Sequence, residues 1–383
     1  MKALLRRPRA PFLAFALLLG SGNSLAADLQ APAPSITDCT SYVLMDFRTG
    51  AILAEKQPNL QLPPASLTKL MTAYLTYKAL AEGRLHWQQQ IPVSNVAWHT
   101  GGSSMFIQPN LPVTIDQLLH GLIIDSGNDA AVALAQAVAG TRASFVAQMN
   151  TEAQKMGLNG AHYTDVDGLP DPGLHLSALN IATLSRDLIQ RYPQVIDISK
   201  IQFYRYNHIT QRSWNPALFG HPSIDGLKTG HTNAAGHCMD TTALRDGRRL
   251  IAVVMGAPNW PAGVDDVVTL LNYGYAFTRD VEAVPQGALI GVYRDPRLDP
   301  QKFTVKAAHS VWVTVPTGEQ GQLQRSVSYR QLGDHGVAAG AVVGTLRITL
   351  HGKVLGETPL LASQASKPAG TLGTWWHEAK DAL

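Results

Sequence analysis

Hydrophobic and polar residues follow different periods in different parts of the chain. Near the N-terminus, the apolar runs Tyr42–Met45 and Ala51–Leu53 flank Arg48-Thr49-Gly50, a pattern that predicts a β-hairpin. From Ser66 to about Ala81 the apolar residues recur every three or four positions. That spacing predicts a helix with one buried face.

The middle of the chain is predicted to be helical. Apolar residues keep the helical period in stretches separated by Gly, Pro and Asn, at residues 115–123, 129–138, 142–156 and 177–191. The first two stretches are separated by the break Ser126-Gly127-Asn128.

Strand-like patterns return after the helical middle, at residues 202–206, 238–244 and 250–255. Asp246-Gly247 between the last two favours a type I′ hairpin turn. A final helix is predicted over residues 265–277. Strands on both sides of a helical middle predict an α+β domain over residues 36–280, with a mostly antiparallel sheet in which N-terminal and C-terminal strands lie side by side.

The composition changes after this domain. Residues 283–363 contain short β-rich runs, such as Val311–Val315, Ser326–Tyr329 and Val342–Leu350, separated by Gly and Pro. We therefore predict a small all-β domain after the α+β domain.

The first 26 residues have the features of a secretory signal. Basic residues precede the apolar run Ala10–Gly20, and small residues follow it near Ala26. The run is interrupted by Pro11 and is shorter than the roughly 20 apolar residues that a spanning helix needs. We expect a signal peptide at 1–26 and an exported, periplasmic protein; a retained N-terminal anchor is the alternative.

Composition and charge narrow the classes of partner. The 383 residues are 45% hydrophobic and 15% charged, which excludes a disordered chain. The net charge of +3 derives from the leader, since residues 1–26 hold four basic and no acidic residues. The rest therefore gives no reason to expect an anionic partner, and no basic patch with interleaved aromatics predicts nucleic-acid binding.

Cofactor and metal sites are not predicted either. The 13 His include no His-Glu-x-x-His string, and no Gly-x-Gly-x-x-Gly or phosphate loop occurs. Cys39 and Cys238 allow one disulfide in an oxidising compartment or two buried thiols, and the sequence does not decide between them.

Ser66 and Lys69 are candidates for covalent catalysis. A serine hydroxyl needs an adjacent base to act as a nucleophile, and residues three apart on a helix lie about one turn apart. For Lys69 to accept a proton, its pKa must fall, which burial and a nearby Lys228 would achieve. The alternative is structural, with Ser66 capping the helix and Lys69 on the surface.

Two later motifs complete the candidate chemistry. In Ser126-Gly127-Asn128, the hydroxyl can relay a proton and the amide can both donate and accept, although either residue can instead cap the following helix. In Lys228-Thr229-Gly230, ahead of strand-like residues, the first two residues supply a charge and a hydroxyl, and the glycine lets a ligand approach the backbone.

Together these motifs resemble the penicillin-binding serine acyltransferases. The strings Ala65–Thr72, Gly121–Asn128 and Asp225–Thr232 resemble more specifically the low-molecular-mass penicillin-binding proteins that are D-alanyl-D-alanine carboxypeptidases. The resemblance implies a penicillin-binding transpeptidase-like domain followed by a C-terminal β-domain. It also implies that peptidoglycan stem peptides and β-lactam antibiotics are partners.

The resemblance assigns roles to the matching residues. Ser66 would attack the carbonyl of the penultimate D-alanine with Lys69 as general base, and Ser126 would pass a proton to the departing D-alanine. Asn128 would orient the substrate amide, and the carboxylate would bind beside Gly230. The backbone N–H groups of Ser66 and His231 would form the oxyanion hole. Lys228 and Thr229 would attract and bind the substrate carboxylate.

The chain departs from the family in two places. Relatives usually carry an arginine shortly after the strand that follows the third motif, whereas residues 257–266 contain no Lys or Arg. Two candidates could replace this arginine as the ligand of the substrate carboxylate: Arg212, or one of the cluster Arg245, Arg248 and Arg249. For the cluster, we expect instead a solvated turn without this role. Residues 371–383 are predicted to form only a short amphipathic helix, and we expect it either to pack on the β-domain or to make weak peripheral contact with the inner membrane.

Three other functions remain open from the sequence. A peptidoglycan D,D-endopeptidase would use the same motifs, and a largely non-catalytic penicillin-binding scaffold would recruit partners through its β-domain. A class A β-lactamase needs a glutamate to activate the deacylating water, and Glu152, within a predicted helix, is the only glutamate between residues 129 and 227. We therefore expect slow release of penicillin.

Overall fold

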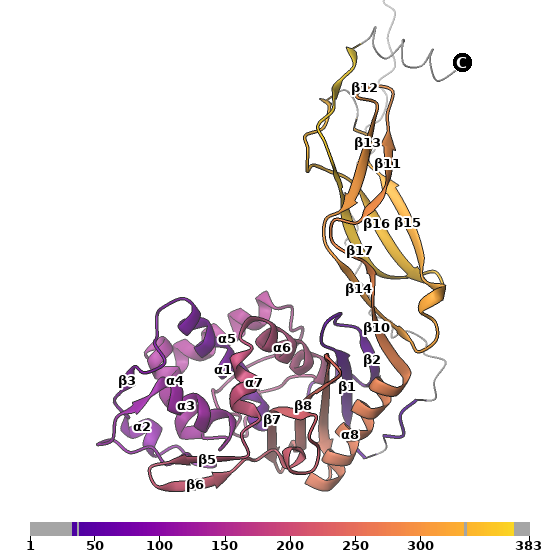
Figure 1. The fold of residues 1–383 in the computed structure, drawn as a ribbon. Helices are drawn as coiled ribbons and strands as arrows, with labels where there is room; N and C mark the ends of the chain where they lie inside the picture. The colour runs from indigo at the N-terminus through magenta and orange to yellow at the C-terminus, as the bar shows by residue number, and fades with distance from the viewer. Residues whose placement is uncertain (1–32, 37, 333–334, 371–383) are drawn as a thin grey trace, which may run out of the picture.

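The computed structural model describes residues 33–36, 38–332 and 335–370. An α+β domain is followed by an elongated β-domain that projects away from it (Figure 1). The predicted fold class is therefore confirmed. The predicted segments 1–26 and 371–383 lie outside the described residues.

A five-stranded sheet forms the centre of the α+β domain, in the order β2-β1-β9-β8-β7. Each neighbouring pair is antiparallel, and pairing of β1 with β9 places the N-terminal and C-terminal strands side by side, as predicted. The strands are β1 (Ser41–Asp46), β2 (Ile52–Lys56), β7 (Ile224–Thr232), β8 (Gly236–Arg245) and β9 (Arg248–Ala257). Asp246 and Gly247 join β8 to β9 with φ values of 49° and 77°, which fit the predicted type I′ turn.

Helices cover both faces of this sheet. On one face lies α8, whose apolar residues Val267, Leu270 and Leu271 share a core with the sheet. The other face packs against the helical cluster, whose core includes Leu67, Leu70 and Leu134 (Figure 1). The helices are α1 (Lys69–Ala81), α2 (Asn95–Trp98), α3 (Ile115–Ile123), α4 (Asn128–Ala139), α5 (Arg142–Lys155), α6 (Ala178–Arg191), α7 (Gln194–Ser199) and α8 (Trp260–Phe277).

Three predicted elements need correction. The helix predicted from Ser66 begins as a 3-10 turn, η1 (Ala65–Thr68), before α1 starts. The helix predicted from residue 265 starts at Trp260, because the Asn259 side chain accepts a hydrogen bond from the Ala262 N–H and Pro261 suits the first turn. The strand predicted at 202–206 begins at Phe203 and lies outside the central sheet, in a separate hairpin.

The β-domain contains the strands predicted at 311–315, 326–329 and 342–350. A five-stranded sheet in the order β11-β13-β17-β16-β15 shares a core with the pair β10-β14. The strands are β10 (Thr278–Val284), β11 (Leu289–Arg294), β13 (Lys302–Ala307), β14 (Val311–Pro316), β15 (Gln324–Tyr329), β16 (Val342–Leu350) and β17 (Lys353–Ala362).

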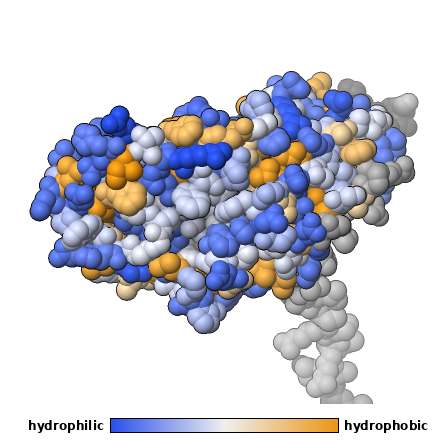
Figure 2. All heavy atoms as spheres, turned by 90° about the horizontal axis from the view of Figure 1, so that it is seen from below, coloured by the Kyte–Doolittle hydropathy of each residue, from blue (hydrophilic) through white to orange (hydrophobic). Residues whose placement is uncertain are grey.

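The remaining elements are short and lie mostly at the surface. They are β3 (Gln90–Ile91), β4 (Val113–Thr114), β5 (Phe203–Tyr206), β6 (Ile209–Arg212), η2 (Pro216–Phe219), β12 (Leu298–Asp299), η3 (Gln320–Gln322) and β18 (Lys367–Pro368). The face in Figure 2 is mostly hydrophilic, with separated hydrophobic patches. Within the described ranges, no single helix has the length and apolarity to span a membrane; α4 and α5 meet that test only as a pair bent by 83°.

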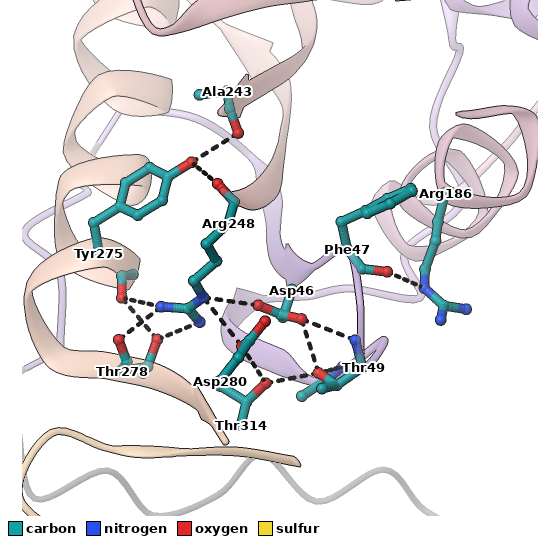
Figure 3. Close-up of polar contacts among 12 residues, drawn as sticks. Asp46, Phe47, Thr49, Arg186, Ala243, Arg248, Tyr275, Thr278, Asp280 and Thr314 are labelled. Carbon is teal, nitrogen blue, oxygen red and sulfur yellow. Dashed lines mark hydrogen bonds and ion pairs between the residues drawn. The ribbon is translucent and has the colours of Figure 1, made fainter. Parts of the chain in front are cut away.

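An ion network joins the two domains where α8 passes into β10 (Figure 3). Arg248 Nε lies 3.0 Å from an Asp46 carboxylate oxygen and 3.1 Å from one of Asp280. The same guanidinium donates to the backbone and side-chain oxygens of Thr278. Two carboxylates thus share one arginine in a largely buried junction. Burial, followed by the contact with Asp46, raises the pKa of Asp280 to about 7.

Because the native state holds a proton on Asp280 that the unfolded chain releases at lower pH, this group makes stability fall as pH rises from the ordinary carboxyl range towards about 7. Asp280→Asn mimics the protonated form. Its free energy of unfolding, relative to wild type, is therefore expected to be higher at about pH 8 than at about pH 5 in urea titrations. Asp299→Asn, at an exposed position, serves as the control. An equal difference at both pH values for Asp280→Asn contradicts the account.

Candidate active site

A cavity of about 370 Å³ opens between the edge strand β7 and the helical cluster. Of the predicted site residues, five contribute to its wall, and Lys69, Asn128 and Lys228 lie buried directly behind it. The lining residues are Ser66, Gly102, Ser103, Ser126, Trp214, Thr229, Gly230, His231 and Trp260. Segments far apart in the sequence therefore meet in one cavity.

Ser66 and Lys69 are brought into contact by the turn that starts α1. Lys69 Nζ donates to Ser66 Oγ over 2.8 Å. Ala65, immediately before the serine, has a positive φ of 49°, a strained conformation of a kind that clusters at functional sites. Ser66 caps no helix here, and Lys69 is fully buried. The structural alternative for this pair is therefore wrong.

The Lys69 amine is held by oxygen acceptors on three sides. Besides Ser66 Oγ, it donates to Asn128 Oδ1 over 2.6 Å and to the Asp167 carbonyl over 2.7 Å. Burial lowers the pKa of Lys69 to about 8, while Asp167, Asp165 and Asp129 oppose the shift. The neutral amine that a base acting on Ser66 requires is therefore reached at a pH well below that of a solvated lysine.

Ser126 and Asn128 lie where α3 and α4 meet. Ser126 has a positive φ of 55°, and Gly127 is the N-cap of α4 without any side-chain cap, so the capping alternative is wrong for both residues. The Asn128 amide accepts from Lys69 and donates to the Gly101 carbonyl over 2.7 Å. Its orientation is therefore fixed from two sides.

The sequence predicted that Lys228 precedes a strand, but it lies inside strand β7. Its amine donates to Ser126 Oγ over 2.9 Å and to the Thr229 carbonyl over 2.8 Å, and it is almost fully buried. Burial, and after it the charge of Lys69, lowers the pKa of Lys228 well below that of a solvated lysine. We expected burial and Lys228 together to lower the pKa of Lys69; burial is the cause found there, and Lys228 does not contribute to the shift.

The next residues of β7 pass close to Ser66. A side chain added at Gly230 would place its Cβ 2.7 Å from the Ser66 backbone nitrogen, so only glycine permits this approach. Thr229 Oγ1 donates to the Trp214 carbonyl over 3.0 Å. His231 follows at the exposed end of the cavity wall.

The candidate arginines do not line this cavity. Arg212 lies in an adjoining hollow that shares Trp214 and Trp260 with it, and its guanidinium stacks 3.7 Å from the centre of the Phe219 ring. The expectation of a solvated turn at 245–249 is wrong, because all three arginines there make structural contacts: Arg245 with Tyr275, Arg248 with Asp46 and Asp280, and Arg249 with Asp225.

Several functional contacts were not found from the sequence. The Asp167 carbonyl accepts a hydrogen bond from the Lys69 amine. Any residue type can supply a backbone carbonyl, so the sequence does not indicate this contact. Gly168 beside it has a φ of +89° and lies against the Ala65 carbonyl. The turn-prone string Asp165-Val166-Asp167-Gly168 was the available indication of a tight loop here.

Cys39 and Cys238 form no disulfide and are both buried, which agrees with the alternative of two buried thiols. No group of three or more His, Cys, Asp or Glu within the described ranges is placed to hold a metal ion.

Comparisons with known proteins agree with this arrangement. The D-alanyl-D-alanine carboxypeptidase family, Peptidase_S11, matches residues 28–259, and the penicillin-binding protein 5 C-terminal domain matches residues 294–367. The chain is 34% identical over 369 residues to the D-alanyl-D-alanine carboxypeptidase DacC of Escherichia coli K12, covering 94% of this chain and 92% of that protein.

Solved structures give the same result. Penicillin binding protein 5 from Haemophilus influenzae superimposes with a TM-score of 0.82 at 31% identity, covering 88% of this chain and 99% of that one. Penicillin-binding protein D2 from Listeria monocytogenes in its cefotaxime-bound form has a TM-score of 0.57 at 27% identity, covering 62% of this chain and 97% of that one.

The close approach at Gly168 generates a test of how the site is held together. In Gly168→Ala the new methyl group would overlap the Ala65 carbonyl, and the φ of +89° disfavours alanine. We expect the free energy of unfolding to fall by at least about 2 kcal/mol in urea titrations. Gly101→Ala is the matched control, because nothing lies within 4 Å of the Cβ position there. Equal stability of the two variants would contradict this packing.

Proposed function

The chain belongs to the D-alanyl-D-alanine carboxypeptidase family and is a serine peptidase, and we propose that Ser66 is its nucleophile, releasing the terminal D-alanine of peptidoglycan stem pentapeptides. The single observation that carries this assignment of the nucleophile is the 2.8 Å contact between Ser66 Oγ and the fully buried Lys69 amine. Family membership and this contact lead to the same chemistry.

In the proposed acylation step, Ser66 Oγ attacks the carbonyl carbon of the penultimate D-alanine while the neutral Lys69 amine accepts the hydroxyl proton. The carbonyl oxygen becomes negatively charged and is stabilised by the backbone N–H groups of Ser66 and His231. The C–N bond then breaks, and the departing D-alanine amine receives a proton through Ser126. The contact between Ser126 and Lys228 supports this relay.

The amide of Asn128 supports orientation of the substrate, since Lys69 and Gly101 fix which end of the amide faces each neighbour. Water then hydrolyses the acyl-enzyme. The Thr229 hydroxyl, which donates to the Trp214 carbonyl in this structure, would turn to donate to the substrate carboxylate beside Gly230, where the absence of a side chain leaves room for the ligand.

Fast β-lactam hydrolysis is not supported. Glu152, the glutamate that we weighed for this role, lies in α5 and forms a 2.8 Å ion pair with Lys78. These two side chains line a different hollow from the one containing Ser66. The geometry therefore favours a long-lived acyl-enzyme with penicillin.

We also propose that the protein acts outside the cytoplasm after removal of residues 1–26, with peripheral membrane contact through residues 371–383. The sequence features described above support both proposals. Washing fractionated membranes with salt and then mild detergent tests the contact, and a fully soluble protein would count against it.

The nucleophile is tested by intact-protein mass spectrometry after brief exposure to penicillin. We expect one covalent adduct, located on the Ser66 peptide, lost in Ser66→Ala, and released slowly compared with its formation. Ser328→Ala, on exposed strand β15, should still be labelled. Folded wild-type protein that leaves Ser66 unmodified would refute the assignment.

The same preparation is then given a stem pentapeptide and a cross-linked dimer. Loss of a single D-alanine from the pentapeptide supports the carboxypeptidase, whereas cleavage of the dimer alone identifies an endopeptidase.

The base is tested by the pH dependence of acylation. Because Lys69 must be neutral to accept a proton, the rate constant for penicillin acylation should rise with pH to a plateau, with a midpoint near the Lys69 pKa of about 8. Lys69→Arg keeps the charge but cannot deprotonate, and should lower the rate by about 10²–10⁴-fold. A rate constant that stays flat with pH through this range, or a fully active Lys69→Arg, would exclude Lys69 as the base.

A further inference from the structure

Among the described residues that line the cavity, His231 has the one side chain that can carry a positive charge. Lys69 and Lys228 lie behind the wall, where their amines already donate to protein oxygens. If the substrate is a D-Ala-D-Ala peptide, as proposed above, its terminal carboxylate needs a cation or strong donors at the open side of the site.

His231 is held in place by a second histidine and a tryptophan. Pairing of β7 with β8 sets His231 opposite His237, and the two rings stack with centroids 4.2 Å apart at 29°. The Trp260 ring packs edge-on against His237 at 4.7 Å and 74°. Since Trp260 also lines the cavity, the three rings form a continuous aromatic group at its open end.

This stack accommodates one positive charge, because two imidazolium rings at this separation repel each other. Burial, and then the neighbouring His231, lowers the pKa of His237, while the carbonyls of Ala257 and Pro258 oppose that shift. His237 therefore has three kinds of neighbour: the His231 ring on β7, the backbone carbonyls at the end of β9, and the uncharged Trp260 ring on α8. None of these neighbours is a carboxylate, lysine or arginine. Of the two stacked rings, His231 is the one that lines the cavity.

We propose that His231, in its protonated form, binds the terminal carboxylate of the substrate, and that His237 and Trp260 position its ring. This inference rests on the proposed carboxypeptidase function and deepens it. His231 is then a substrate-binding residue through its side chain, in addition to any role of its backbone N–H. His237 and Trp260 are positioning residues, since they act through His231.

Arg212 is the competing cation. It lies beyond Trp214 and Trp260 in the adjoining hollow, and its guanidinium already stacks on Phe219. Thr229, the hydroxyl proposed for the carboxylate, directly precedes Gly230 and His231 on the cavity wall. This neighbourhood favours His231 over Arg212.

The test compares two pentapeptides that end in D-Ala-D-Ala, one with a free carboxylate and one with a terminal carboxamide. Their ratio of kcat/KM isolates carboxylate recognition, because proton transfer through Lys69 affects both peptides. In the wild-type protein we expect the ratio to be greatest at about pH 5.5 and to fall as pH rises, since the binding form of His231 is lost on deprotonation. A ratio that does not change with pH overturns the proposal.

Variants separate charge from structure. His231→Gln should lower the ratio at about pH 5.5 by about ten-fold or more and make it independent of pH. His237→Phe keeps a stacked ring and should retain most of the ratio, whereas His237→Ala removes the ring that positions His231 and should lower the ratio at about pH 5.5. His309→Gln, at an exposed site in the β-domain, should change neither quantity.

Two results would overturn the inference: an unchanged ratio in His231→Gln, or a loss of the ratio in Arg212→Gln. Calorimetric affinities of the two peptides for Ser66→Ala give the corresponding ratio without turnover. Absence of D-alanine release from the wild-type protein therefore counts against the proposed function, whereas an affinity ratio that does not depend on His231 counts against this inference.

Discussion

The Lys69 amine is buried away from water, and the arrangement of the site follows from the acceptors that this burial requires. A buried charge or donor is costly unless it is paired, so three segments must bring an oxygen to the same nitrogen. The 3-10 turn supplies Ser66 Oγ, the start of α4 supplies Asn128 Oδ1, and the loop before α6 supplies the Asp167 carbonyl. Desolvation lowers the pKa of the amine to about 8, so the same constraint that assembles the site also favours the general base proposed above.

A second buried amine repeats this pattern on the sheet side. Lys228 on edge strand β7 binds Ser126 Oγ, so each lysine holds one serine at the cavity. Because both amines face inward, neither lies on the cavity wall, and the open side depends on other groups. His231, stacked on His237, lies on that side, and residues 257–266 contain no Lys or Arg.

Sequence periodicity predicted most of the fold, because burial of one helix face or one strand face is a local pattern. It placed α3 at its observed bounds and the β8–β9 turn at Asp246-Gly247. The same approach failed where a side-chain cap or strand pairing decided the result, as at Asn259 before α8 and in the β5–β6 hairpin. Spacing and family resemblance identified Ser66 and Lys69. The Asp167 carbonyl, the stacking of His231 on His237 and the cavity wall at Trp214 depend on tertiary packing, which a single sequence does not encode in residue types.

The central claim is that Lys69 is a buried amine with a lowered pKa. Its most direct test is an NMR titration of the Lys69 side chain in protein labelled with ¹³C-lysine, with the resonance assigned by its absence in Lys69→Arg. The account predicts a titration midpoint near pH 8, well below the 10.5 of an unperturbed lysine. A midpoint at or above 10.5 in the folded protein would contradict it.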